Sequence, residues 1–235
     1  MKYSISQRNK IIHEVNDFTK TKKIIFDGIN LFLNKHTLIP HPDTFELIPL
    51  AIEVIQKNNW IKTVADVGTG SGVIAVSLAK KFPAKTFFAS DISKEALNIA
   101  KRNSVLNRTR NIHFLQNTNR VWLSEYKSRN IDFIVSNPPF VGEKEFNHEN
   151  FVQTHPEVKL EPAGAIVTRG DEYGLSPYLE IIKNSNKTNT KLYFFQCNSE
   201  TIKSLAVEIQ KIIRCEIDIS KDTAEFERFL LISKM

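Results

Sequence analysis

Residues 63–72 read Thr-Val-Ala-Asp-Val-Gly-Thr-Gly-Ser-Gly, a short apolar run that passes directly into a glycine-rich loop. Apolar residues resume at helical spacing after the loop, over 73–81. A strand that enters a helix through glycines is typical of nucleoside-binding α/β folds, because glycine lets a ligand approach the backbone without a Cβ in the way. The loop therefore predicts a ligand site at the carboxyl end of a parallel strand.

The same alternation of apolar runs and amphipathic stretches continues along the chain. The expected strands, the first five covered on both faces, are 63–66, 86–91, 112–116, 131–136, 191–196, 215–220 and 226–233. The expected helices are 73–81, 94–103 and 201–213. Ser93 is the expected N-cap of the second helix. This order predicts an α/β, Rossmann-like fold with a seven-stranded, mostly parallel sheet and helices on both faces.

Upstream of the loop the signals are shorter. Asp27-Gly28 stands between two apolar runs, Ile24 to Phe26 and Ile29 to Leu33, and predicts a β-hairpin. A helix is expected over 47–55 and one further short helix over 11–18.

Composition limits the class of protein. The chain has 235 residues, 41% of them hydrophobic and 16 of them Phe, which fits one globular catalytic domain. Its beginning lacks the apolar run of a signal peptide, and no stretch approaches the roughly 20 apolar residues that span a bilayer, so we expect a cytoplasmic protein without a membrane partner. Cys197 and Cys215 are isolated, which predicts two buried thiols and no metal site. A net charge of +6 leaves a nucleic-acid partner open without favouring it.

Asp91 ends the second strand, 19 positions beyond Gly72. An acidic side chain at this point can accept both hydroxyls of a ribose, which strengthens the prediction of a nucleoside cofactor. NAD, FAD and S-adenosylmethionine all remain open at this stage. The residues predicted to bind the cofactor are Asp66, Gly68, Thr69, Gly70, Ser71, Gly72 and Asp91.

The tetrapeptide Asn137-Pro138-Pro139-Phe140 follows the 131–136 strand, at the edge where open α/β sheets bind ligands. Neither NAD nor FAD chemistry needs it, whereas methylation of a planar amide or amino nitrogen has a use for each part. An amide nitrogen is a poor nucleophile because its lone pair is delocalised. The side-chain oxygen of Asn137 and the carbonyl of Pro138 can accept its two N–H hydrogens and aim the lone pair at a sulfonium methyl.

The remaining parts of the tetrapeptide fit the same chemistry. Pro138 and Pro139 make a rigid turn without backbone donors, and Phe140 can stack on a flat amide or base. These residues predict a class I methyltransferase that uses S-adenosylmethionine, with Asn137 also in contact with the cofactor. The predicted catalytic residues are Asn137, Pro138, Pro139 and Phe140.

With these motifs the chain resembles the release factor glutamine methyltransferases, which methylate the glutamine of the Gly-Gly-Gln motif in peptide chain release factors. The likeness includes Leu38 to Thr44, Glu161 to Leu175, and Lys221-Asp222 with Arg228. It implies protein methylation in translation termination and a release factor as the partner. It also implies an adenine pocket that includes Thr118 and Asn119. Separately, we expect a monomer.

The chain departs from that family's usual pattern at several positions. His41 stands in place of an Arg, Phe140 in place of a Tyr, and Gln196 in place of a common Glu, while Thr118-Asn119 replace an Asp and a large apolar residue. Compared with the family, residues 1–45 are expected to be a shortened N-terminal segment with a helix and a hairpin. Residues 46–235 are expected to form the S-adenosylmethionine-binding catalytic domain.

Two other functions stay open from the sequence. One is an adenine-N6 methyltransferase acting on RNA or DNA, which uses the same type of tetrapeptide, although no basic insertion for base extrusion is seen. The other is a noncatalytic module that binds the cofactor or a translation factor.

Overall fold

The computed structural model describes residues 22–26, 28–117, 126, 129–148, 151, 161–168, 170–186 and 188–235. The helix expected over 11–18 lies outside these residues, and so do Thr118 and Asn119.

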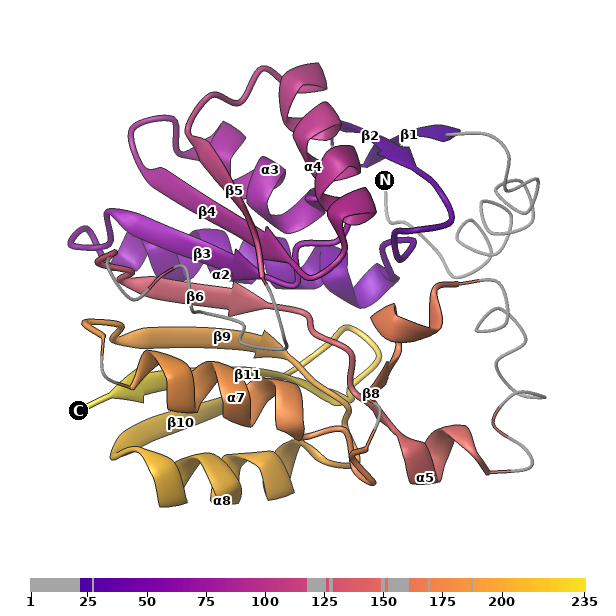
Figure 1. Cartoon of the computed structure of the whole chain (residues 1–235). Helices are drawn as coiled ribbons and strands as arrows, with labels where there is room; N and C mark the ends of the chain where they lie inside the picture. The colour runs from indigo at the N-terminus through magenta and orange to yellow at the C-terminus, as the bar shows by residue number, and fades with distance from the viewer. Residues whose placement is uncertain are drawn as a thin grey trace.

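A seven-stranded sheet crosses the protein in the order β10-β11-β9-β6-β3-β4-β5 (Figure 1). Its strands are β3 (Thr63–Val67), β4 (Thr86–Asp91), β5 (Ile112–Gln116), β6 (Phe133–Ser136), β9 (Leu192–Gln196), β10 (Cys215–Lys221) and β11 (Glu227–Lys234). β11 is antiparallel to both of its neighbours, and the other pairs are parallel. The predicted mostly parallel, seven-stranded α/β sheet is confirmed.

Helices cover both faces of the sheet (Figure 1). Neighbouring residues in a strand point to opposite faces, so Phe194 packs with α2 (Pro42–Lys57) and α3 (Val73–Lys81). Phe195 packs instead with α7 (Ser176–Ser185) and α8 (Ile202–Ile212). The all-apolar runs of the central strands therefore arise from burial on two sides.

The edge strand β5 does not follow the predicted burial. We expected it to be covered on both faces, but His113 and Gln116 are exposed and the other three residues are only partly buried. The prediction was wrong because, among the described strands, β5 pairs only with β4 and ends the sheet. His113 stacks on Phe88 of β4 with 5.1 Å between ring centroids, which covers part of the exposed face.

The predicted hairpin is present as β1 (Lys22–Phe26) and β2 (Ile29–Leu33), with Gly28 at a φ of 74° in its turn. Two asparagines hold β2. Asn103 lies in α4 (Lys94–Leu106), and Asn107 follows directly after that helix. Asn103 accepts from the Phe32 N–H at 2.6 Å and donates to the Phe32 carbonyl at 3.0 Å. Asn107 makes the same pair of hydrogen bonds with Asn30, at 2.9 and 2.6 Å. The two side-chain amides thus make the backbone hydrogen bonds that a second neighbouring strand would make on the other side of β2 from β1.

The helix expected over 47–55 is longer than predicted, because α2 begins at Pro42. Proline suits the first turn of a helix, where its missing N–H would have no partner. Helix α7 and the short elements around the site were not predicted individually. These short elements are β7 (Val141–Gly142), α5 (Glu143–Phe146), the 3-10 turn η3 (Ala163–Ala165) and β8 (Val167–Thr168).

Two predictions from composition can be compared with the described residues. Cys197 and Cys215 are both buried, as expected. No helix in the described part of the chain has the length and apolar character needed to cross a membrane.

Candidate active site

The glycine-rich loop between β3 and α3 is held from below by strand β4. The N–H groups of Gly68 and Thr69 both donate to the Ser90 carbonyl, at 2.9 and 2.8 Å. Gly68, Gly70 and Gly72 have φ values of 74°, 54° and 81°, a region that favours glycine. At Gly70 a Cβ would meet open space, whereas at Gly72 it would lie 3.0 Å from the Cβ of Ala100. Gly70 thus faces the ligand side of the loop and Gly72 allows α3 and α4 to approach.

Asp66 lies beneath the loop rather than in the cavity wall. Its Oδ2 accepts from the Thr69 hydroxyl at 2.7 Å and from the Ala75 N–H at 3.1 Å. Burial raises the pKa of Asp66 to about 7 although both hydrogen bonds lower it. The structure therefore gives Asp66 the task of tying the loop to the first turn of α3, and a direct contact with the cofactor stays a prediction.

Asp91 lies at the end of β4 and joins the loop to α4. Its Oδ2 accepts from the Gly70 N–H at 2.8 Å and its Oδ1 from the Ser93 N–H at 2.9 Å. The Ser93 hydroxyl accepts from the Ala96 N–H at 3.1 Å, which confirms the predicted N-cap. The two carboxylate oxygens together have four lone pairs, so Asp91 retains acceptor capacity for a ribose hydroxyl.

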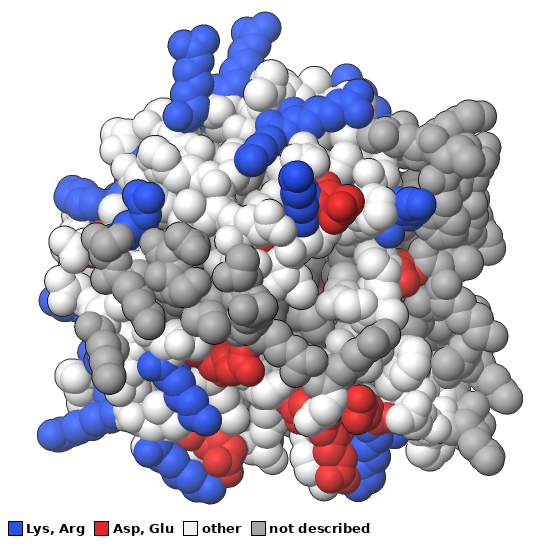
Figure 2. Space-filling model, in the orientation of Figure 1, with Lys and Arg blue, Asp and Glu red and all other residues white. Residues whose placement is uncertain are grey.

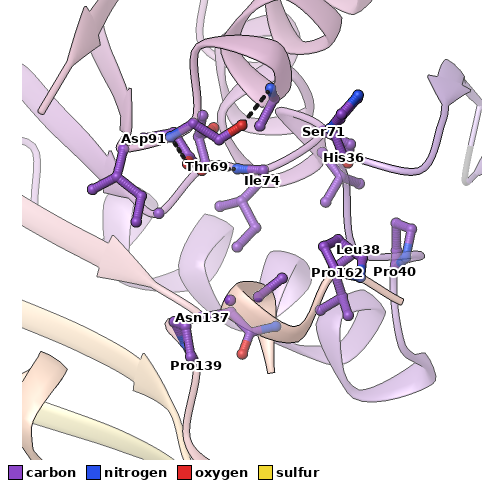
Figure 3. A pocket seen from close by; sticks show the side chains of 18 of the residues that line it. His36, Leu38, Pro40, Thr69, Ser71, Ile74, Asp91, Asn137, Pro139 and Pro162 are labelled. Atoms are coloured by element: carbon purple, nitrogen blue, oxygen red, sulfur yellow. Dashed lines mark hydrogen bonds between the residues drawn. The ribbon is translucent and has the colours of Figure 1, made fainter. Parts of the chain in front are cut away.

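A cavity of about 210 Å³ lies over the glycine loop. Figure 3 shows Thr69 and Asp91 on one wall, with Asn137 and Pro139 on the opposite wall. Of the residues predicted to bind the cofactor, those that line this cavity are Gly68, Thr69, Gly70, Ser71, Asp91 and Asn137. We call this space the cofactor pocket.

The tetrapeptide is fixed by side chains from distant parts of the chain. The Asn137 Nδ2 donates to the Thr44 hydroxyl of α2 at 3.1 Å, which leaves its side-chain oxygen free for another donor. The Thr168 hydroxyl of β8 donates to the Pro139 carbonyl at 3.1 Å. Asn137 is therefore oriented by the start of α2, an element that sequence reasoning did not connect with it.

Residues 170–175 press against the end of the tetrapeptide. At Gly174, which has a φ of 72°, an added Cβ would overlap the Phe140 carbonyl oxygen and lie 2.7 Å from its carbon. At Gly142 an added Cβ would lie 2.6 Å from the Glu172 carbonyl carbon. Asp171 shapes the segment by accepting from the N–H groups of Tyr173 and Gly174, both at 3.0 Å. Two backbone segments are thus in direct contact, and Phe140 takes its place from that contact.

A second cavity, of about 350 Å³, lies on the other side of the tetrapeptide. Its wall includes Pro138 and Phe140, together with residues from α2, α5, β9 and β11. Asn137 lines both this cavity and the cofactor pocket. We call the second space the acceptor pocket, because a group bound there meets the cofactor pocket at Asn137.

Arg228 of β11 closes one side of the acceptor pocket. Its Nε lies 3.3 Å from both the Asp43 and the Asp222 carboxylates, and its Nη1 donates to the Cys197 carbonyl at 3.2 Å. Burial opposes ionisation of Asp43, but its hydrogen bond with His41 and the nearby charges of His41 and Arg228 bring its pKa below the ordinary value. Arg228 is thus already paired with two carboxylates.

Several residues at the site were not predicted as functional. The start of α2 contributes His41, Asp43 and Thr44, which the sequence marked only through a family resemblance. Gln196 lines the acceptor pocket, and His36 lines the cofactor pocket. Short-range motifs could not reveal them because they reach the site through the packing of α2 and β9.

Comparison with known proteins gives relatives that are all methyltransferases by name. Residues 49–173 match the family model described as the methyltransferase small domain. A release factor glutamine methyltransferase of Flavobacterium psychrophilum is 31% identical, with 88% of this chain and 72% of the relative covered. The enzyme of the same name from Enterococcus faecalis is 34% identical, with 83% and 69% covered.

A solved structure confirms the fold. The catalytic domain of hMettl16, in complex with the MAT2A 3'UTR hairpin 6, superposes with a TM-score of 0.69 over 100% of this chain and 83% of its own, at 20% identity. At that identity the likeness shows a shared fold.

Proposed function

The chain belongs to the release factor glutamine methyltransferase family, and we propose that it methylates the side-chain amide of the glutamine in the Gly-Gly-Gln motif of a peptide chain release factor. It is a methyltransferase, with S-adenosylmethionine as its cofactor. The observation that carries the proposal is the position of Asn137 between the two pockets. A donor in the cofactor pocket and an amide in the acceptor pocket would meet at this side chain.

The residues of the cofactor pocket fit S-adenosylmethionine. Open space at Gly70 leaves room for a ligand against the backbone, and Asp91 keeps acceptor sites for a ribose. Ile74 and Ile92 give the pocket an apolar surface against which an adenine ring can pack. When bound, the cofactor supplies a methyl group on a sulfonium sulfur, which keeps the electron pair of the broken S–C bond.

The tetrapeptide prepares the nitrogen for attack. The Asn137 side-chain oxygen, set by Thr44, accepts one N–H of the acceptor amide, and the Pro138 carbonyl accepts the other. Both contacts hold the lone pair toward the cofactor pocket. Phe140 lies in the acceptor pocket, where its ring can stack on the flat amide. The nitrogen then loses one proton to water, since it becomes acidic once it is positively charged.

The charges of the acceptor pocket favour a neutral acceptor over a phosphorylated one. Four acidic side chains line it, and Arg228 is already paired with two carboxylates. These acidic residues are Asp43, Glu145, Glu161 and Glu200. In Figure 2 most Asp and Glu side chains on the visible face lie in its lower half, where Lys and Arg side chains lie as well, and further Lys and Arg side chains cover the top and the left. A nucleic-acid backbone in the acceptor pocket would be repelled.

The two alternatives are therefore weaker. An adenine amino group could use Asn137 and stack on Phe140, but its flanking phosphates would approach the acidic wall. A noncatalytic module does not need an Asn137 that is oriented between two pockets. Because release factors act in translation, the proposal places the enzyme in the cytoplasm. Residues 46–235 would carry the catalysis, and the hairpin before them would pack on α4.

Transfer of labelled methyl from S-adenosylmethionine to a purified release factor tests the proposal. Label should enter the factor and should be absent when its Gly-Gly-Gln glutamine is replaced by alanine. Asn137→Ala should lower kcat by roughly 100-fold or more, as the loss of a transition-state contact does. If the labelled methyl entered RNA and not the release factor, the adenine-N6 alternative would replace the proposal.

A further inference from the structure

Gln196 is the last residue of β9 and lies beside Asn137. Ser136 and Phe195 are partners in the parallel register of β6 and β9. The next residues, Asn137 and Gln196, therefore lie next to each other at the ends of the two strands, which are spaced roughly 5 Å apart. Phe195 points toward α7 and α8, so Gln196 points to the opposite face, where α2 begins. Both Asn137 and Gln196 line the acceptor pocket.

The side-chain oxygen of Gln196 is buried without a hydrogen bond from any described residue. The residue is 1% exposed, and among the described residues its Oε1 has no donor. Its backbone carbonyl, in contrast, accepts from the Tyr178 hydroxyl at 2.7 Å. Asn198, in the same pocket, is satisfied: its Nδ2 donates to Glu145 at 3.0 Å and its Oδ1 accepts from the Glu200 N–H at 2.9 Å.

A buried amide oxygen without a donor lowers stability, and such a group in a pocket indicates a ligand that supplies the donor. We infer that the Gln196 Oε1 accepts a hydrogen bond from the amide nitrogen of the methyl acceptor, sharing in a bifurcated bond the N–H that also points at the Asn137 side-chain oxygen, because a primary amide has only two N–H groups. Gln196 is then a third oxygen around that nitrogen, beside the Asn137 side chain and the Pro138 carbonyl. The inference rests on the proposed function, because it takes an amide as the group in the acceptor pocket.

The chemistry of methyl transfer explains what the oxygen of Gln196 could contribute. As the nitrogen lone pair forms the new N–C bond, the nitrogen becomes tetrahedral and positively charged, and its N–H bonds leave the amide plane. An N–H on a charged nitrogen makes a stronger hydrogen bond than a neutral one. Gln196 therefore stabilises the transition state more than the bound substrate, which raises kcat. The proton that the nitrogen finally releases goes to water, so Gln196 is not a base.

Two variants with side chains of similar length separate this role from packing. Gln196→Met removes the oxygen, and Gln196→Glu keeps it and replaces the side-chain nitrogen by a second oxygen. With purified release factor, Gln196→Met should lower kcat about tenfold or more while the Kd of S-adenosylmethionine stays the same. Its unfolding temperature should be equal or higher, since an unsatisfied polar group is gone. Gln196→Glu should retain transfer, with a rate that rises with pH as the buried carboxyl ionises, a step absent from the wild type.

The outcomes distinguish the inference from the proposed function. Label transfer by the wild type together with an unchanged kcat in Gln196→Met would overturn the role of Gln196 and leave the proposed function standing. A lower unfolding temperature with weaker cofactor binding in Gln196→Met would also overturn it, in favour of a packing role. No transfer to release factor by the wild type would overturn both.

Discussion

Replacing Gly174 by alanine should disable the acceptor pocket, and replacing Gly170 provides a matched control. Both glycines lie in the same segment and have nearly the same φ, 72° and 75°. An added Cβ at Gly170 would have nothing within 4 Å, whereas at Gly174 it would overlap the Phe140 carbonyl. The two variants therefore share the cost of a left-handed alanine, and only Gly174→Ala also pushes on Phe140.

The expected losses of stability follow from two costs, that of a left-handed alanine and that of the overlap with Phe140. A left-handed alanine costs roughly 1–2 kcal/mol, which sets the loss of unfolding free energy in Gly170→Ala. Overlap with backbone atoms adds roughly 1–3 kcal/mol in Gly174→Ala. For a chain of this size each kcal/mol lowers the unfolding temperature by about 2–4 °C. The expected decreases are therefore about 2–8 °C for Gly170→Ala and about 4–20 °C for Gly174→Ala.

Activity should separate the variants more clearly than stability. A displacement near 1 Å at a positioning residue can cost about 100-fold, so Gly174→Ala should lower kcat/KM for the acceptor by roughly 10–100-fold. Gly170→Ala should stay near the wild type, and neither variant should change the cofactor Kd, because Phe140 lines only the acceptor pocket. Thermal unfolding, calorimetric cofactor binding and methyl-transfer kinetics measure the three quantities. Equal losses of kcat/KM in both variants would refute the reasoning.

Three further substitutions test the rest of the site. Burial raises the pKa of Asp66 from 3.8 to about 7, so between those values the folded chain keeps a proton that the unfolded chain has lost. The free energy of unfolding should fall there by roughly 1.4 kcal/mol per pH unit, a slope that urea titrations should find absent in Asp66→Asn. Thr44→Val removes the hydroxyl that orients Asn137 and should lower single-turnover rates roughly fivefold, whereas equal rates in Thr44→Val and Thr44→Ser would contradict that role. Asn103→Leu leaves both backbone groups of Phe32 unpaired and should destabilise the chain by about 3 kcal/mol in urea unfolding, with a loss under 1 kcal/mol counting against the strand-like role.

The sequence predicted those parts of the site in which one short motif determines both the position of the residues and their chemistry. The glycine loop and the tetrapeptide each follow a strand, so their place at the carboxyl edge of the sheet follows from strand order alone. Thr44 and Gln196 could not be predicted as site residues, because they reach Asn137 only after α2 packs on the sheet and β9 pairs with β6. The wrong burial of β5 has a similar origin. An apolar run indicates a strand, but its position at the sheet edge depends on pairing that no local pattern contains.

The costly features of the fold gather at the carboxyl edge of the sheet. Gln196 is buried without a donor, and Asp66 is buried with a raised pKa. Each lowers stability, and each borders one of the two pockets or the loop that forms one. The stabilising core of apolar strand residues lies away from this edge, between the helices. The acceptor amide would supply the donor that the Gln196 oxygen lacks, so a group that lowers stability in the free protein becomes a hydrogen-bonding contact once the acceptor is bound.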